Sequence, residues 1–180
     1  MKTFLVLFFT MPFLVYSQGE HTILLPIDSI SGKITYKEII QIDSISEEKL
    51  YSFCKVSVSK LYKGSKLPIK IEDFGNNKLI SKISFSVPFI RAVDLEVYCT
   101  ITVECKSNKV RILLSDFLLY WSDDGKFVDK LESKYPEDSL HTPMKKKWRN
   151  SYVEIDKTSK RIIELFKLYL NNSINDDKKW

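Results

Sequence analysis

The segment Leu95–Lys106 alternates apolar and polar residues at all twelve of its positions. Successive side chains of a β-strand point to opposite faces of a sheet, so this alternation predicts a strand with one buried face and one solvated face. The residues predicted to face the core are Leu95, Val97, Cys99, Ile101, Val103 and Cys105. The residues between them are expected to face water.

Weaker patterns of the same kind lie on both sides of this segment. Residues 32–43 alternate with period two, and their apolar side consists of Ile34, Tyr36, Ile40 and Ile42. A turn at Gly75-Asn76-Asn77 separates Ile69–Asp73 from Leu79–Val87, which predicts a hairpin that ends at Pro88.

A turn at Ser107-Asn108-Lys109 leads from the clearest strand into Val110–Trp121. The end of that segment, Phe117–Trp121, is apolar at nearly every position. Such a run is typical of an interior strand that is covered on both faces.

Two segments show the three- and four-residue spacing of amphipathic helices. Ser44 or Ser46 can cap the first helix, which is expected to end near Gly64. Its apolar stripe consists of Leu50, Cys54, Val58, Leu61 and Tyr62. The second helix starts near Met144, can break at Asp156–Ser159, and is expected to fray over Asn171–Trp180.

The order strand, helix, four strands, helix predicts an α+β fold, in which a five-stranded antiparallel sheet carries both helices on one face. The composition is that of one globular domain, with 44% hydrophobic and 28% charged residues. The expected organisation is a leader at 1–17, an N-terminal segment at 18–31, a sheet domain with the first helix at 32–121, a loop at 122–143, and a helix with its tail at 144–180.

The first seventeen residues have the parts of a secretory signal. Lys2 precedes an apolar run from Phe4 to Tyr16, and the small residue Ser17 follows it. The run is shorter than the roughly 20 residues that span a bilayer. Because Gln18 rather than cysteine would begin the mature chain, no thiol is present there for a lipid anchor. We therefore expect a soluble exported protein, periplasmic or extracellular, with no lipid anchor and no transmembrane span.

Removal of the leader takes away Lys2 and no acidic residue, so the net charge falls by one from +5, to +4. The chain has three cysteines, and an oxidising compartment would allow two of them to pair. Cys99 and Cys105 lie six positions apart in one predicted strand, about 20 Å from each other, and cannot bond. The alternatives are a disulfide between Cys54 and one of these two, or three buried thiols.

Several short motifs resemble, in their order, those of one uncharacterised family. They are Leu25-Pro26, Gly32-Lys33-Ile34-Thr35-Tyr36, the strand that ends in Asp43, Ser46-Glu47-Glu48-Lys49-Leu50-Tyr51, Lys109-Val110-Arg111-Ile112 and Ser115-Asp116-Phe117. Over about residues 25–121 the chain resembles a family of mostly exported bacterial proteins, described as a domain of unknown function with a TATA-binding-protein-like (TBP-like) fold. The resemblance implies a fold and a compartment. It implies no catalytic residues, because that family has no assigned activity.

Two surfaces are candidates for contact with a partner. The first is the polar sheet face, with Lys37, Lys82, Glu96, Tyr98 and Glu104. The second is the basic run Lys145, Lys146, Lys147, Trp148 and Arg149, in which the tryptophan either lies in an interface or packs on the sheet. The sheet face mixes both charges, whereas binding of a DNA groove needs a basic field and apolar wedges. We therefore do not expect nucleic acid as a partner.

Few residues offer the chemistry of a metal site or a catalytic site. Histidine occurs only at His21 and His141, which is not a zinc-binding spacing. Asp123-Asp124-Gly125 predicts a turn rather than a calcium loop, because alternating ligands are missing before the glycine. No Gly-x-Ser-x-Gly motif is present. We expect no catalytic residue, no metal and no cofactor.

These observations favour a non-enzymatic binding or structural module of the cell envelope, whose partner is another envelope protein. Its contact surface would be the polar sheet face or the loop at 122–143. The alternative is a carrier of a small apolar ligand or lipid, with a cavity between helices and sheet. The residues that would line that cavity are Phe85, Val97, Ile101, Val103, Phe166 and Tyr169. A third hypothesis is a hydrolase that uses His141 with Asp116 or Asp138.

Overall fold

The computed structural model describes residues 25–62, 72–73, 77–90, 93–121, 127–135 and 142–178. Its elements follow the chain in the order β1 (Tyr36–Gln41), α1 (Glu47–Leu61), β2 (Glu72–Asp73), β3 (Lys78–Ile90), β4 (Val93–Lys106), β5 (Lys109–Trp121), β6 (Phe127–Lys130), α2 (Leu131–Lys134) and α3 (Thr142–Asp177). The predicted leader at 1–17 lies outside the described residues. No helix in the described ranges is long and apolar enough to cross a membrane.

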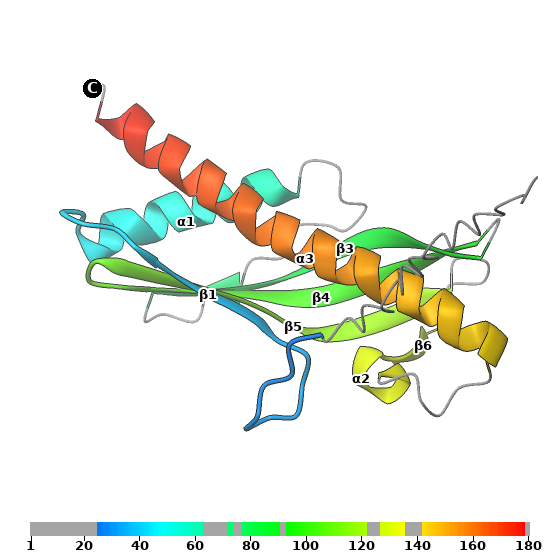
Figure 1. Ribbon diagram of the computed structural model, residues 1–180. Helices are drawn as coiled ribbons and strands as arrows, with labels where there is room; N and C mark the ends of the chain where they lie inside the picture. Colours follow the sequence, from blue (N-terminus) through cyan, green and yellow to red (C-terminus); the bar gives the residue numbers. More distant parts are fainter. Residues whose placement is uncertain are drawn as a thin grey trace, which may run out of the picture.

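The strands form one antiparallel sheet in the order β1-β5-β4-β3-β2. α1 packs on β4, and α3 packs on β3, β1 and α1. Figure 1 shows both of these helices on the same side of the sheet, with α3 running diagonally across it. The predicted α+β architecture is therefore confirmed.

The range 122–143, expected to be a loop, contains two additional elements. β6 pairs with the end of β5 over Leu118–Tyr120, whereas β1 pairs with the beginning of β5 over Lys109–Leu114. α2 follows β6 directly, and its Glu132 carboxylate accepts a hydrogen bond of 3.0 Å from the backbone N–H of Ile34. The segment before β1 is thereby attached to the edge of the sheet.

β4 has the predicted alternation. Its odd-numbered residues from Leu95 to Cys105 are at most 2% exposed, and its even-numbered residues lie on the other face. The turn at Ser107-Asn108 joins β4 to β5, with Lys106 and Lys109 as register partners. Asn108 has a φ of 62°, which asparagine tolerates in tight turns.

A β-bulge in β5 changes which residues face the core. Thr100 pairs with Ser115 and Tyr98 with Leu118, so Asp116 and Phe117 together face the single residue Cys99. Buried residues therefore have even numbers up to Leu114 and odd numbers from Phe117 onward. The apolar run Phe117–Trp121 was predicted to be covered on both faces, but Leu118 and Tyr120 are only half-buried.

α1 begins at the second of the two predicted caps. The Ser46 Oγ accepts a hydrogen bond of 3.4 Å from the backbone N–H of Lys49, and Glu47 and Glu48 occupy the positive end of the helix dipole. Leu50, Cys54, Ser57 and Val58 form the buried stripe. Leu61 is half-buried, and Gly64 lies outside the described residues.

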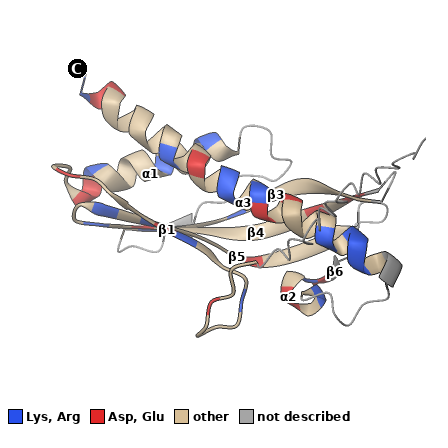
Figure 2. Ribbon diagram, in the orientation of Figure 1, with Lys and Arg blue, Asp and Glu red and all other residues tan. Residues whose placement is uncertain are grey.

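α3 is one unbroken helix over Asp156–Ser159, contrary to the expected break. Lys160 pairs with Asp156 at 2.7 Å on the exposed side, where Figure 2 shows basic and acidic residues along the helix. The Tyr36 hydroxyl donates a hydrogen bond of 3.2 Å to the same carboxylate. The ion pair lies within α3, and the hydrogen bond joins α3 to β1. These polar residues therefore stabilise the helix instead of interrupting it.

The C-terminal part of α3 is also ordered beyond Asn171, where fraying was expected. Ile174 is buried, and Asp177 forms an ion pair of 2.6 Å with Lys49 in the first turn of α1. Contacts with α1 therefore stabilise the last turns, which the sequence of α3 alone does not indicate.

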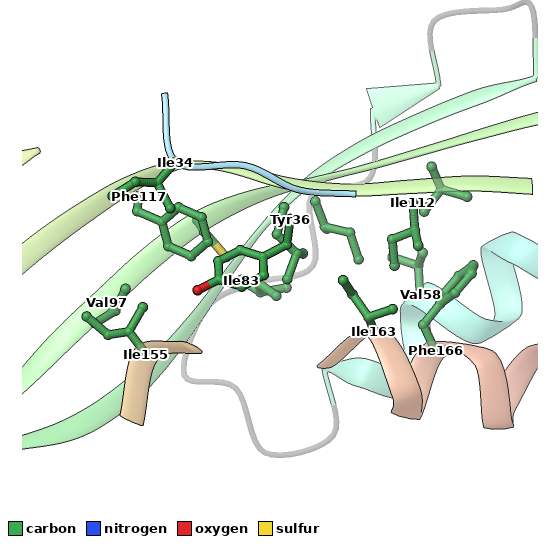
Figure 3. Close-up of a cluster of buried hydrophobic side chains, with 14 of the residues drawn as sticks. Ile34, Tyr36, Val58, Ile83, Val97, Ile112, Phe117, Ile155, Ile163 and Phe166 are labelled. Atoms are coloured by element: carbon green, nitrogen blue, oxygen red, sulfur yellow. The ribbon is translucent and has the colours of Figure 1, made fainter. Parts of the chain in front are cut away.

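The core lies between the sheet and the two long helices. Figure 3 shows Ile155, Ile163 and Phe166 of α3 directed toward the side chains of the sheet. Phe166 is completely buried, whereas Leu168, one half-turn further along the same helix, is 52% exposed. The two residues allow a direct comparison of core and surface positions on one element.

We expect Phe166→Ala to lower the free energy of unfolding by about 3–5 kcal/mol, because it removes a large buried ring and leaves a cavity. The control Leu168→Ala is expected to change it by less than about 0.5 kcal/mol. Urea denaturation followed by circular dichroism measures both. Equal losses for the two variants would contradict the described helix orientation.

Candidate functional site

The sheet has one face without a helix among the described residues, here called the open face. It carries the even-numbered residues of β3 from Lys78 to Ser86 and of β4 from Glu96 to Lys106, with their register partners. All five predicted sheet contacts lie on it: Lys37, Lys82, Glu96, Tyr98 and Glu104. The structure thus brings these residues together on one surface.

Three charged residues form a row across the open face. Glu104 lies opposite Lys78 on one neighbouring strand and opposite Arg111 on the other. Its carboxylate accepts a hydrogen bond of 2.9 Å from the Arg111 Nε, a second one from the Arg111 Nη2, and lies 3.3 Å from the Lys78 Nζ. Burial opposes ionisation of Glu104, but the hydrogen bonds from Arg111 and Lys78 outweigh it and lower the pKa of the carboxyl.

An aromatic pair occupies another part of the same face. The rings of Tyr98 and Tyr120 meet edge to face, with their centroids 4.5 Å apart. The Tyr98 hydroxyl donates a hydrogen bond of 2.9 Å to the Glu96 carboxylate. Burial, and then this hydrogen bond, raise the pKa of Tyr98, so the phenol stays protonated as a donor.

The bulge of β5 adds an acidic residue beside the aromatic pair. Asp116 has a φ of 53°, an uncommon conformation for a residue other than glycine that aspartate tolerates better than most. Its carboxylate accepts a hydrogen bond of 2.5 Å from the Lys33 Nζ. Asp116 lines two surface hollows, one shared with Tyr98 and Lys82 and the other with Lys33 and Glu132.

The second predicted surface, the basic run on α3, lies on the covered side of the sheet and is separate from the open face. Trp148 is only 2% exposed. Its ring meets that of Phe89 edge to face, with the centroids 4.8 Å apart, and stacks on that of Tyr152, with the centroids 5.8 Å apart. The prediction that Trp148 contacts a partner is therefore wrong, and its alternative, packing on the sheet, is correct. The flanking residues Lys145, Lys146, Lys147 and Arg149 are exposed or half-exposed.

Sequence reasoning did not include Arg111 or Tyr120 in the candidate site, and it considered Asp116 for function only as a possible catalytic partner of His141. Hairpin register was the available signal, because the two-residue turn at 107–108 places Arg111 opposite Glu104. The bulge then shifts the register by one residue, and only the shifted register places Tyr120 opposite Glu96.

Most residues that the sequence analysis considered for a metal site or a catalytic site are not among the described residues. His21, His141, Asp138 and Asp123-Asp124-Gly125 lie outside them. Within the described ranges, no group of three or more His, Cys, Asp or Glu side chains is placed to hold a metal ion. What the open face offers chemically is hydrogen bonding, aromatic contact and paired charges.

Four of the residues proposed to line a carrier cavity are instead in the packed core. Val97, Ile101, Val103 and Phe166 are at most 1% exposed. A cavity large enough for a lipid chain would leave accessible surface on the side chains around it. Phe85 and Tyr169 are half-buried. This packing does not favour the carrier hypothesis.

We expect Glu104→Gln to destabilise the protein at neutral pH by about 0.2–1 kcal/mol, the range for opposite charges on adjacent strands. A lowered pKa in the folded state means that the contribution is complete above the ordinary carboxyl value of 4.5 and is lost as the pH falls through the folded value. Thermal unfolding of both proteins between pH 3 and pH 7 measures the difference. A difference that is the same at all pH values would contradict the ionised row.

Comparisons with known proteins identify the domain that carries the open face. The family described as a domain of unknown function (DUF4468) with TBP-like fold matches residues 36–119. No curated protein matches the chain.

Two solved structures have a similar fold. A TBP-like protein from Parabacteroides distasonis ATCC 8503 has a TM-score of 0.59 and 14% identity, over 79% of this chain and 97% of the other. A DUF4468 family protein from Bacteroides ovatus ATCC 8483 has a TM-score of 0.58 and 17% identity, over 78% and 89%. At these identities the structural likeness shows the fold alone. Together with the match in sequence it leads to one assignment: residues 36–119 of this chain are a DUF4468 domain with a TBP-like fold.

Proposed function

We propose that the protein is exported and acts, without enzymatic activity, as a binding or structural module of the cell envelope that contacts another envelope protein through its open face. One observation carries the proposal: α1 and α3 lie on one face of the sheet, and the other face presents an edge-to-face tyrosine pair between charged residues.

The composition of the open face suits a protein partner. Tyrosine and arginine are enriched at protein interfaces, because each combines a large contact area with hydrogen bonding. Tyr98, Tyr120 and Arg111 are all half-buried and already held by neighbours on the same face. Held side chains lose less conformational entropy when a partner binds.

The charges of the open face argue against nucleic acid as the partner. Glu104 pairs with both Lys78 and Arg111, and Asp116 pairs with Lys33. Binding of a phosphate backbone needs cations that exchange bound counterions for phosphates. Basic residues that already have carboxylate partners do not provide such a field.

The proposed compartment rests on the sequence of residues 1–17, which have the charged, apolar and cleavable parts of a secretory signal. We expect the protein in the periplasmic or extracellular fraction of its own host. Its intact mass should be that of a chain that begins at Gln18. A cytoplasmic protein that retains Met1–Ser17 would contradict export.

A photo-crosslinking experiment tests the contact surface. A benzophenone amino acid replaces Tyr98 in the full chain, expressed in its own host, and a control variant carries it at Leu168, which is 52% exposed on α3. Irradiation of intact cells is expected to give a discrete adduct with an envelope protein from position 98 and none of that size from position 168. Adducts of equal yield from both positions, or none from position 98, would contradict the proposal.

A second variant tests whether the aromatic pair contributes to the contact. In the position-98 variant the benzophenone side chain takes the place of the Tyr98 ring, and adding Tyr120→Ala removes the second ring of the pair. We expect the adduct yield to fall at least severalfold, whereas Lys157→Ala on the exposed side of α3 is expected to leave it unchanged. An unchanged yield in the Tyr120→Ala variant would mean that the contact does not include the pair.

A further inference from the structure

Two of the three cysteines meet between α1 and the sheet. The Cys54 and Cys105 thiols share a hydrogen bond, with the two sulfur atoms 3.3 Å apart. Cys54 is in the middle of α1 and Cys105 is near the end of β4, and they are 0% and 2% exposed. Sequence reasoning left two partners open for Cys54, and the structure places Cys105 beside it.

Cys99 is excluded from this contact by the geometry of β4. It faces the core from the same strand as Cys105, but six residues of extended chain separate the two by about 20 Å. Cys99 is 2% exposed. Burial raises the pKa of its thiol, so it is a poor nucleophile in the folded protein.

We propose that Cys54 and Cys105 form a structural disulfide that joins α1 to β4 when the protein folds in an oxidising compartment, and that Cys99 remains a thiol. The inference rests on the proposed export, because thiols stay reduced in the cytoplasm.

The bond forms by thiol–disulfide exchange with a small-molecule or protein disulfide as the oxidant. The thiolate of one cysteine attacks a sulfur of the oxidant, which releases one thiolate and leaves a mixed disulfide. The second cysteine loses its proton and displaces the other half of the oxidant. The protein thus gives up two electrons and two protons, and the oxidant is reduced to two thiols.

The burial of both sulfur atoms determines when this reaction takes place. In the folded protein an oxidant cannot reach either thiol, and the hydrogen bond with Cys105, together with burial, raises the pKa of Cys54. Exchange therefore precedes the packing of α1 on the sheet. After packing, the same burial protects the disulfide from reductants.

The bond links positions 51 residues apart in the sequence. A cross-link over such a segment restricts the unfolded chain and so stabilises the folded state. We expect the disulfide to raise the Tm of a domain of this size by about 5–15 °C. It also fixes α1 to the sheet at the centre of the helix. The side chains of Cys54 and Cys105 lie on the covered face, so the bond leaves the open face unchanged.

Thiol counting tests the pairing. Protein from its own host is denatured in acid, and its thiols are alkylated with a maleimide with and without prior reduction. We expect one adduct without reduction and three after it, with a linked peptide pair that contains Cys54 and Cys105. Three adducts in the unreduced exported protein, or a linkage that includes Cys99, would overturn the proposal.

Three variants serve as controls. Cys99→Ser keeps the bond and is expected to give no adduct without reduction and two after it, with the same fall in Tm on reduction as the wild type. Cys54→Ser and Cys105→Ser are each expected to give two adducts with or without reduction and a Tm that a reductant does not change. A Tm that responds to reductant in these two variants would contradict the assignment.

Refolding separates the pairing from the question of export. The purified protein is reduced, unfolded and refolded with oxidised glutathione. A bond that forms here but is missing from a protein found in the cytoplasm supports the pairing and overturns the proposed export. Three free thiols after refolding to the native circular dichroism spectrum overturn the pairing itself, wherever the protein is located.

Discussion

The structure depends on the burial of one face of β4 and the exposure of the other. β4 pairs along nearly its whole length with β3 on one side and β5 on the other. Its odd-numbered residues from Leu95 to Cys105 lie beneath the helices at 0–2% exposure. This burial fixes the register of both neighbours, because a slip of one residue would turn each apolar set toward water. The helices can then cover only the face where these residues gather. The open face is a consequence of the same alternation.

The bulge at Asp116 lets the second half of β5 keep its apolar residues on the covered face of the sheet. If β5 continued as a regular strand through Asp116, Phe117 and Leu119 would point to the open face, and Leu118 and Tyr120 would point to the core. The left-handed conformation of Asp116 costs less than exposing a phenylalanine and a leucine, each worth about 1.5–3 kcal/mol when buried. The bulge also places an acidic side chain and Tyr120 on the open face. One backbone irregularity therefore serves both the core and the candidate site.

The features that the sequence predicted correctly are those set by local periodicity. The alternation of β4, the cap at Ser46 and the α+β order are examples, since each depends on neighbours in the sequence. The features that were missed depend on distant contacts. β6 is only four residues long, and the end of α3 is held by Lys49 of α1. Tyr120 was missed because the alternation of apolar and polar residues does not indicate where a bulge shifts the register of β5.

The same alternation separates the chemistry of the chain into two compartments. The three cysteines are buried on the covered side, where packing determines their reactivity. The tyrosine pair and the charged row lie on the open side, where no described helix covers them. A change in the redox state of the covered side would alter the stability of the scaffold without touching the surface available to a partner. Rigid support on one side and an exposed surface on the other are what the proposed binding module requires.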